Sequence, residues 1–305
     1  MLDLDPNREI VRPRDASTVV VVRRPAPGDG TPGGPGSGRT GRPGGDASFE
    51  VLCVRRHDRS GFLGGAIVFP GGKVDVTDTD PGWAQASTGL AARAPAEPAA
   101  LAFAVAALRE LLEEAGLAVV AGGDASPATV AALRASAREP SAQGLAAALA
   151  ARGLRLDTAR LTTLSRWVTP EAEHRRFDTR FYVLIAPAGQ DAEHDDHETT
   201  ESFWATPASV LARWEAGEVM LAPPTSHTLT VLARARTLDE VLALAHVHPL
   251  DPVCPHFALD GADAVLALPG DPLHPSSRAV LCDRADPTRF VLENGRFVPR
   301  RAGPA

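Results

Sequence analysis

The chain has 305 residues, of which 44% are hydrophobic, and its formal net charge is −7 at pH 7. This length allows a large buried core, and the acidic balance gives no electrostatic support for binding a nucleic acid polymer. No apolar run approaches the ~20 residues that a membrane span needs, so we expect no membrane association. Three widely spaced cysteines and an N-terminal segment without an apolar signal core predict a protein of the reducing cytoplasm.

The first predicted elements are two strands joined by a long connection. Residues 1–16 are expected to form a tail. The β-branched run at 17–24 and the apolar run at 49–56 predict strands that pair as a hairpin. The connection, about residues 25–47, is dominated by glycine and proline and has too few apolar side chains to pack. We therefore expect a disordered loop there, because the cost of closing a loop rises only slowly with its length.

A polar loop follows at residues 57–65. Arg59 in this loop is a candidate for contacts to phosphate, and Phe62 is a candidate to stack on a ligand. An ordinary polar connection between two strands is the alternative interpretation of the same residues.

The next strand is predicted at 66–69 and ends in a glycine pair. We interpret Gly71 and Gly72 as a tight turn, in which main-chain atoms can approach a metal or a phosphate because no Cβ intervenes. An insertion of about residues 77–97 comes next, and we expect its Trp83 to fold back on the core.

The segment from 99 to 117 has the periodicity of an amphipathic helix. At 100° per residue, one apolar stripe contains Leu101, Ala104, Leu108, Leu111 and Ala115. The acids Glu110, Glu113 and Glu114 fall on the opposite side. Three carboxylates so close repel one another unless a cation lies between them, and hard oxygen ligands favour Mg²⁺ or Mn²⁺. Taken alone, the pattern also fits a solvated face of a surface helix.

Alanine-rich helices and then alternating strands and helices are predicted in the second half of the chain. Helices are expected at 127–138, 141–152, 207–217, 225–235 and 237–245, with Thr206 as a cap, and strands at 161–168, 180–186 and 203–205. From residue 246 the sequence changes to proline, aspartate and short apolar runs, with strands predicted at 264–268 and 289–299. Asn294-Gly295 is the strongest hairpin signal in the chain.

The glycine pair and the acidic helix together resemble the motif of the Nudix hydrolase family. The second half of that motif runs Arg-Glu, an apolar residue, any residue, Glu-Glu, any residue, Gly and an apolar residue, and residues 109–117 match it without a gap. The resemblance implies an α/β/α sandwich around a mixed sheet, with Gly/Pro-rich loop insertions. It extends over residues 17–245, and residues 246–305 are expected to be a small C-terminal extension that contains a β-hairpin.

Further matches, at residues 60–75, 167–170, 176–181 and 198–204, resemble the acyl-CoA diphosphatase branch of this family. The resemblance implies an enzyme that uses Mg²⁺ (or Mn²⁺) to hydrolyse the pyrophosphate bond of CoA, acyl-CoA or a related nucleoside diphosphate derivative. Two alternatives stay open: a pyrophosphatase for ADP-ribose, dinucleotides or nucleotide sugars, and a non-catalytic nucleotide-binding protein. The partner is expected to be a small nucleotide-diphosphate substrate; the oligomeric state is open, with a homodimer as one option.

The resemblance also implies roles for individual residues. The metal ligands are expected to be Glu110, Glu113, Glu114 and Gly72, and the residues that carry catalysis Glu110, Glu113, Arg109 and Glu201. Glu198 is an alternative to Glu201 as general base, and either acid also fits a solvated loop. Arg109 is expected to brace the glycine loop, or else to form a surface ion pair of little worth. Substrate contacts are expected from Arg59, Phe62, Gly71, Arg176, Phe177 and Arg180, although Arg180 also fits a structural role within its strand.

One departure from the family motif concerns its first glutamate. Gly72 and Arg109 are 37 positions apart (109 − 72), whereas the family pattern has 14, so 23 residues are inserted. Counting eight residues back from Arg109 reaches Leu101 in place of the glutamate. Asp80 and Glu97 are the nearest upstream carboxylates, which leaves open the partner of a salt link to Arg109.

A rival metal site lies in the C-terminal segment, where His246, His248, Cys254 and His256 are closely spaced. Their order fits no zinc module that we can justify, and the proline-rich context also fits a packed turn.

Overall fold

The computed structural model describes residues 3–25, 49–57, 64–90, 99–123, 125–139, 142–193, 199–247, 250–278 and 286–302. Within these ranges the main sheet contains β1 (Arg14–Arg23), β2 (Glu50–Arg56), β3 (Ile67–Val68), β4 (Gly71–Lys73), β7 (Thr162–Val168), β8 (Phe177–Ile185), β9 (Thr199–Ala205) and β10 (Pro252–Val253). The strand order is β10-β7-β8-β1-β2-β3, with β4 paired to β1 and β9 paired to β2. Because β1 and β8 run parallel while β1 and β2 run antiparallel, the sheet is mixed, as predicted.

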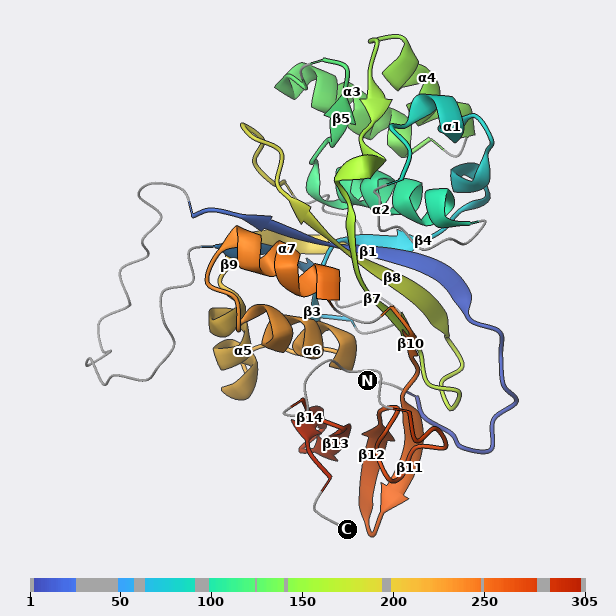
Figure 1. The fold of residues 1–305 in the computed structure, drawn as a ribbon, viewed down its shortest axis with the longest axis vertical. Coiled ribbons are helices and arrows are strands. Elements are labelled where there is room, and N and C mark those ends of the chain that lie inside the picture. The colour runs from blue at the N-terminus through green and yellow to red at the C-terminus, as the bar shows by residue number, and fades with distance from the viewer. Residues whose placement is uncertain are drawn as a thin grey trace, which may run out of the picture.

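Helices cover both faces of this sheet (Figure 1). One face carries α1 (Trp83–Ala86), α2 (Ala100–Ala115), α3 (Pro127–Ala137) and α4 (Ala142–Ala150), together with the 3₁₀ turns η1 (Val76–Thr79) and η2 (Thr158–Arg160) and the short pair β5 (Val120–Ala121) and β6 (Arg155–Leu156). The other face carries α5 (Pro207–Glu215), α6 (Pro223–Leu232) and α7 (Leu238–Val247). The fold is therefore the predicted α/β/α sandwich.

The valine run of β1 explains why this strand lies in the middle of the sheet. Successive side chains of a strand point to opposite faces. Val19 and Val21 accordingly pack in the core under α2, whereas Val20 and Val22 pack in the core under α5–α7. A strand buried on both faces has a continuous apolar run instead of an alternating one.

Most predicted elements are confirmed, with shifted ends. β1 begins three residues before the predicted strand, at Arg14, and β8 begins three residues before its prediction, at Phe177. Trp83 packs on the core as predicted, and its indole nitrogen donates to the Thr77 carbonyl. The glycine loop between the first two strands lies outside the described residues.

The prediction of a tight turn at Gly71-Gly72 was wrong. These residues belong to the short strand β4, which pairs antiparallel with β1 so that Gly72 lies opposite Ser17 and Gly71 opposite Thr18. A Cβ on Gly71 would lie 2.3 Å from the Ser17 carbonyl oxygen. A glycine is therefore needed at position 71 because the backbones of β4 and β1 approach closely.

Helix α2 is buried over most of its circumference. The carbonyl of Leu112 accepts from the amide of Gly116, whose φ of 65° ends the helix in the left-handed conformation that glycine tolerates. Arg109 and Glu114, which the periodicity places opposite the apolar stripe, are nevertheless 7% and 4% exposed. The polar side of α2 therefore lies under β4 instead of facing solvent.

The C-terminal residues form a second sheet, β11 (His256–Asp260), β12 (Asp263–Ala267), β13 (Arg289–Glu293) and β14 (Arg296–Arg300), paired in that order. The hairpin predicted at Asn294-Gly295 is confirmed, and both residues have positive φ, 49° and 77°. This sheet lies beside the main sheet and follows directly on β10 (Figure 1). Among the described residues, no helix is long and apolar enough to cross a membrane.

Candidate active site

The two halves of the glycine and acid motif meet where α2 packs against β4. A Cβ built on Gly72 would lie 2.3 Å from Oε1 of Glu110 and 2.4 Å from its carboxyl carbon. No side chain fits in that space, so a glycine is required for the Glu110 carboxylate to lie against the β4 backbone. Two residues 38 positions apart (110 − 72) are thus brought into direct contact.

Arg109 connects the helix to the segment after β4. Its guanidinium donates to both carboxylate oxygens of Asp78, at 2.9 Å each, and to the Lys73 carbonyl at 3.0 Å. Asp78 is 2% exposed and also accepts from the Asp75 amide. Burial alone lowers the pKa of Arg109, but the hydrogen bond with Asp78 and the nearby carboxylates of Glu110 and Glu113 raise that pKa above its ordinary value. The arginine therefore carries a permanent charge in the interior.

Asp78 is the functional residue that the sequence analysis missed. Counting back from Arg109 crosses the insertion and reaches Leu101, whereas counting six residues forward from Gly72 reaches Asp78. The 23 inserted residues therefore follow the acidic position of the motif and do not remove it. A shorter acid stands where the family pattern has glutamate, and it makes the salt link to Arg109.

The three helix carboxylates have different surroundings. The other guanidinium nitrogen of Arg109 donates to Glu110 and to Glu113, at 3.0 Å each. Burial raises the pKa of Glu113, and Arg109 opposes that rise. Glu114 instead accepts from the Gly71 amide at 2.9 Å and lies behind β4. Glu110 and Glu113 thus face the pocket described below, while Glu114 fixes the strand to the helix.

Among the described residues, no three or more His, Cys, Asp or Glu side chains are grouped closely enough to hold an ion. The chemistry of the donors nevertheless fits Mg²⁺ or Mn²⁺, since they are carboxylate oxygens at the edge of a cavity. Arg109 supplies the positive charge that Glu110 and Glu113 contact in this structure. The metal site at Glu110, Glu113, Glu114 and Gly72 stays a prediction.

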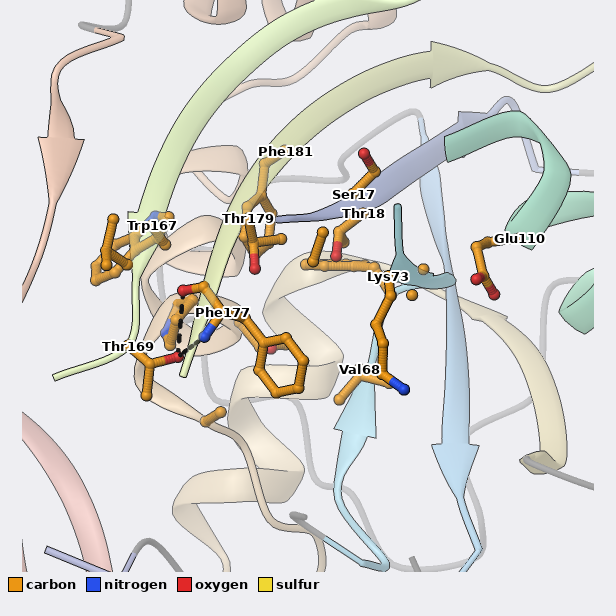
Figure 2. Close-up of a pocket in the computed structure, with 18 of the residues that line it drawn as sticks. Ser17, Thr18, Val68, Lys73, Glu110, Trp167, Thr169, Phe177, Thr179 and Phe181 are labelled. Carbon is orange, nitrogen blue, oxygen red and sulfur yellow. Dashed lines mark hydrogen bonds between the residues drawn. The ribbon is translucent and has the colours of Figure 1, made fainter. Parts of the chain in front are cut away.

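A pocket of about 500 Å³ opens beside these residues. Figure 2 places Glu110 on one side of the pocket and Trp167 on the opposite side, with Lys73 and Phe177 between them. The acidic end is lined by Asp75, Glu110 and Glu113, and the cations Arg56 and Lys73 line the same pocket. Trp167 and Phe181 lie on the other side, and the apolar side chains Val68 and Leu266 also line the pocket.

Two of the predicted substrate residues line this pocket, Gly71 and Phe177. Two others lie outside the described residues, Arg59 and Phe62. Lys73 and Arg56, which the sequence analysis did not select, line the pocket together with Arg109. Arg56 is the last residue of a predicted strand and Lys73 follows the glycine pair, and only their position in the fold distinguishes them from the many other cations of the chain.

The prediction that Arg176 contacts substrate was wrong. Its side chain is buried, and its guanidinium donates to the Thr169 carbonyl at 3.1 Å and the Val11 carbonyl at 2.7 Å. A charged group can be buried when carbonyl oxygens satisfy its donors. Arg176 therefore connects the segment that precedes β1, at Val11, to the segment that follows β7, at Thr169.

Arg180 has a structural role, which was the alternative for this residue. It is buried, donates to Asp178 and lies with its guanidinium carbon 4.1 Å from the centroid of the Phe103 ring. The ring face attracts the cation and α2 is thereby held to β8. Arg180 is not one of the described residues that line the pocket.

Glu201 is also placed away from the pocket, which contradicts its assignment as general base. It lies on β9 opposite Arg55 of β2, and its carboxylate accepts from Arg55 at 3.0 Å. Its side chain is 47% exposed, and it is not among the described residues that line the pocket. The alternative base, Glu198, lies outside the described residues.

The rival metal site does not assemble in the part of the chain that the structure describes. Cys254 donates to the Thr169 carbonyl at 3.8 Å, and its own carbonyl contacts His274 at 3.0 Å. His256 packs edge to face against His274, with ring centroids 6.0 Å apart. His248 lies outside the described residues. The packed turn is the interpretation that these contacts support.

Comparisons with known proteins agree with this geometry. A family model described as the NUDT19 Nudix domain matches residues 88–232. The chain is 28% identical over 295 residues to acyl-coenzyme A diphosphatase NUDT19 of Gallus gallus, covering 80% of this chain and 77% of that protein. It is 23% identical over 304 residues to the protein of the same name from Xenopus laevis, covering 82% and 80%.

A solved structure is similar as well. The crystal structure of a NUDIX hydrolase from Alicyclobacillus acidocaldarius superposes with a TM-score of 0.64 at 29% identity, covering 77% of this chain and 97% of that one. The sandwich fold, the glycine and carboxylate contact of α2 with β4 and these likenesses lead to one conclusion. The chain is similar to the Nudix hydrolases and, among them, to the NUDT19 proteins.

Proposed function

We propose that this protein is a divalent-metal-dependent diphosphatase that hydrolyses the pyrophosphate bond of coenzyme A or acyl-coenzyme A. The observation that carries the proposal is the pocket itself, which is lined by Glu110 and Glu113 of α2, by cationic side chains and by apolar side chains. Such a cavity fits a substrate with a charged diphosphate and an apolar part. The relatives named as acyl-coenzyme A diphosphatases are similar over most of this chain, which supports the same substrate class.

Glu110, Glu113 and Glu114 are the residues that would hold Mg²⁺ or Mn²⁺, with the Gly71-Gly72 backbone beside them. A bound divalent ion neutralises phosphate charge and orients water. Arg109 holds Glu110 and Glu113 beside the pocket and is itself fixed by Asp78 and the Lys73 carbonyl. Because its guanidinium is buried and makes several hydrogen bonds, we assign Arg109 this bracing role and not a surface ion pair.

The remaining steps fall to side chains that line the pocket. Lys73 and Arg56 offer positive charge to the phosphate oxygens of the substrate. We assign Glu113 to accept the proton of the attacking water, because its carboxylate lines the pocket beside Glu110. This assignment replaces Glu201, which bonds Arg55 instead.

The non-catalytic alternative was favoured by one feature, the missing first acid of the motif. Asp78 occupies that position and bonds Arg109 through both oxygens. The motif therefore has its first acid, and the reason for a non-catalytic protein is removed. We retain hydrolysis as the proposed function.

The experiment is a substrate screen with purified protein. CoA, acetyl-CoA, longer acyl-CoAs, ADP-ribose, NADH and diadenosine compounds are incubated with Mg²⁺ or Mn²⁺, and the phosphate-containing products are identified by chromatography and mass spectrometry. We expect cleavage of the CoA compounds at the diphosphate, with loss of activity when the metal is chelated. Turnover of ADP-ribose or dinucleotides alone would contradict the proposed substrate class, and binding without cleavage would contradict the enzyme.

A further inference from the structure

The C-terminal sheet shares a core with the catalytic fold. The apolar cluster that contains Trp167 of β7 also contains Leu266, Phe290 and Phe297 of this sheet, together with Leu268, which follows β12. Strand β10, which precedes the sheet, pairs parallel with β7 and so extends the main sheet. Burial of this much apolar surface fixes the C-terminal sheet in one position relative to the pocket.

The same sheet supplies part of the wall of the pocket. The cavity is lined by Pro255, between β10 and β11, and by Leu266, near the end of β12, together with Trp167 and Phe177. Leu266 is 1% exposed and lies opposite Phe257 on one side and Phe290 on the other. The contributed wall is thus aliphatic and held by its neighbours.

The wall lies at the end of the pocket away from the carboxylates. Figure 2 shows Glu110 and Trp167 on opposite sides of the cavity. Val253 of β10 pairs with Trp167, so Pro255, two residues further on, lines the pocket near Trp167. The aliphatic side chains Val68, Pro170 and Leu266 also line the pocket, and they offer few hydrogen-bonding groups. An apolar chain gains from leaving water there, whereas a polar ring would leave its nitrogens unsatisfied.

We infer that the C-terminal sheet forms the binding subsite for the acyl chain of the substrate, with Leu266 as the residue that limits its depth. The inference rests on the proposed function, because it assigns the apolar part of an acyl-CoA to a place in the same pocket. Each methylene that enters the subsite raises kcat/KM by about fourfold until the subsite is full. Residues 246–302, in this view, select the substrate.

The test compares chain-length profiles. Affinities for CoA, hexanoyl-CoA and dodecanoyl-CoA are measured by calorimetry with the metal chelated, and kcat/KM is measured for the same compounds with Mg²⁺. In the wild type, acyl-CoAs bind more tightly than CoA. Leu266→Ala deepens the subsite and raises the ratio of dodecanoyl-CoA to hexanoyl-CoA by about tenfold or more, and Leu266→Phe lowers that ratio.

Leu268→Ala is the matched control. Leu268 follows β12, is fully buried in the same cluster and is not among the described residues that line the pocket. Its substitution removes the same atoms from the same sheet, so a similar loss of thermal stability is expected with an unchanged chain-length ratio. If Leu266→Ala and Leu268→Ala change the ratio equally, or if neither changes it, the inference is wrong.

The outcomes separate the inference from the proposed function. Hydrolysis of all CoA compounds with affinities that do not depend on the acyl chain overturns the subsite and leaves the enzyme. Chain-dependent affinity without hydrolysis supports the subsite and overturns the enzyme. Equal changes in the affinity for CoA and for acyl-CoAs in the Leu266 variants would mean that the apolar end holds the nucleotide ring, which also overturns the inference.

Discussion

The carboxylate of Asp78 accepts two hydrogen bonds of 2.9 Å from the guanidinium of Arg109, although the two residues are 31 positions apart in the chain. Both side chains are buried, and the same guanidinium contacts Glu110 and Glu113. The pair therefore links the segment after β4 to the face of α2 that carries the acids. An insertion within the motif is tolerated because the residues on its two sides are fixed to one another by this pair.

Removal of the Asp78 carboxylate is expected to destabilise the protein strongly. Asp78→Ala leaves the buried charge of Arg109 with its Glu110 and Glu113 contacts but without its two-pronged partner. Breaking a buried pair by removing one member costs about 3–5 kcal/mol, because the remaining charge is poorly solvated. The free energy of unfolding in urea measures this loss.

Asp80→Ala is the control for this experiment. Asp80 lies two residues further along the same segment, is exposed, and accepts from the Gly82 amide at 2.7 Å. Its removal is expected to cost about 1 kcal/mol or less. Equal losses for the two variants would mean that Asp78 acts only as a turn residue.

Gly72→Ala is expected to reduce turnover about 100-fold while the protein stays folded. The added Cβ overlaps the Glu110 carboxylate, and the carboxylate must move away from the β4 backbone. A displacement of about 1 Å at a reacting group lowers rates by this order. Kinetics with the preferred substrate and a thermal melt measure the two effects. Wild-type turnover in this variant would mean that the contact between Gly72 and Glu110 has no part in catalysis.

How far the sequence predicted the fold depends on how local each signal is. The valine run of β1, the Asn294-Gly295 turn and the cap at Thr206 act within a few residues, and the structure agrees with each. The pairing of β4 with β1 depends on residues more than 50 positions apart, so the glycine pair was interpreted as a turn.

The site was predicted unevenly for the same reason. The acids of α2 follow one another in the sequence, so their grouping could be derived. Closely spaced arginines such as Arg176 and Arg180 are typical of a phosphate site. Only the fold shows that Arg176 bonds backbone carbonyls and that Arg180 contacts a carboxylate and an aromatic ring. Lys73 has no distinguishing neighbours in the sequence, and its place in the pocket follows from the pairing of β4.

Glu110→Gln and Glu114→Gln are each expected to reduce metal-dependent hydrolysis by about three orders of magnitude or more, since each removes a charged ligand. An amide oxygen can still accept from the Gly71 amide, so the fold is retained in the Glu114 variant. Metal titration followed by turnover measures the effect, with Glu139→Gln, an exposed acid after α3, as the control. Near wild-type turnover in either variant would remove that residue from the metal site.

Lys73 and Glu201 make a contrasting pair of predictions. Lys73→Ala removes a cation from the pocket and is expected to lower kcat/KM about 10- to 100-fold, the value of a hydrogen bond to a charged group. Glu201→Gln leaves kcat/KM within about twofold of the wild type, because Glu201 bonds Arg55 on the strand and not the pocket. Loss of activity in the Glu201 variant, with Lys73 dispensable, would contradict the assignment of both residues.

The C-terminal sheet is expected to lose stability in acid through Asp271. Burial alone raises the pKa of Asp271, but hydrogen bonds from Arg289, Thr288 and the Leu273 amide lower it below its ordinary value. A carboxyl whose pKa is lower in the folded state stabilises that state above the unfolded pKa of about 3.9, and the contribution disappears as pH falls through the folded value. The difference in unfolding free energy between the wild type and Asp271→Asn should therefore shrink between pH 6 and about pH 2. Urea titrations at both pH values measure it, with the exposed Asp263→Asn as control, and a difference independent of pH would mean that the Asp271 charge contributes nothing.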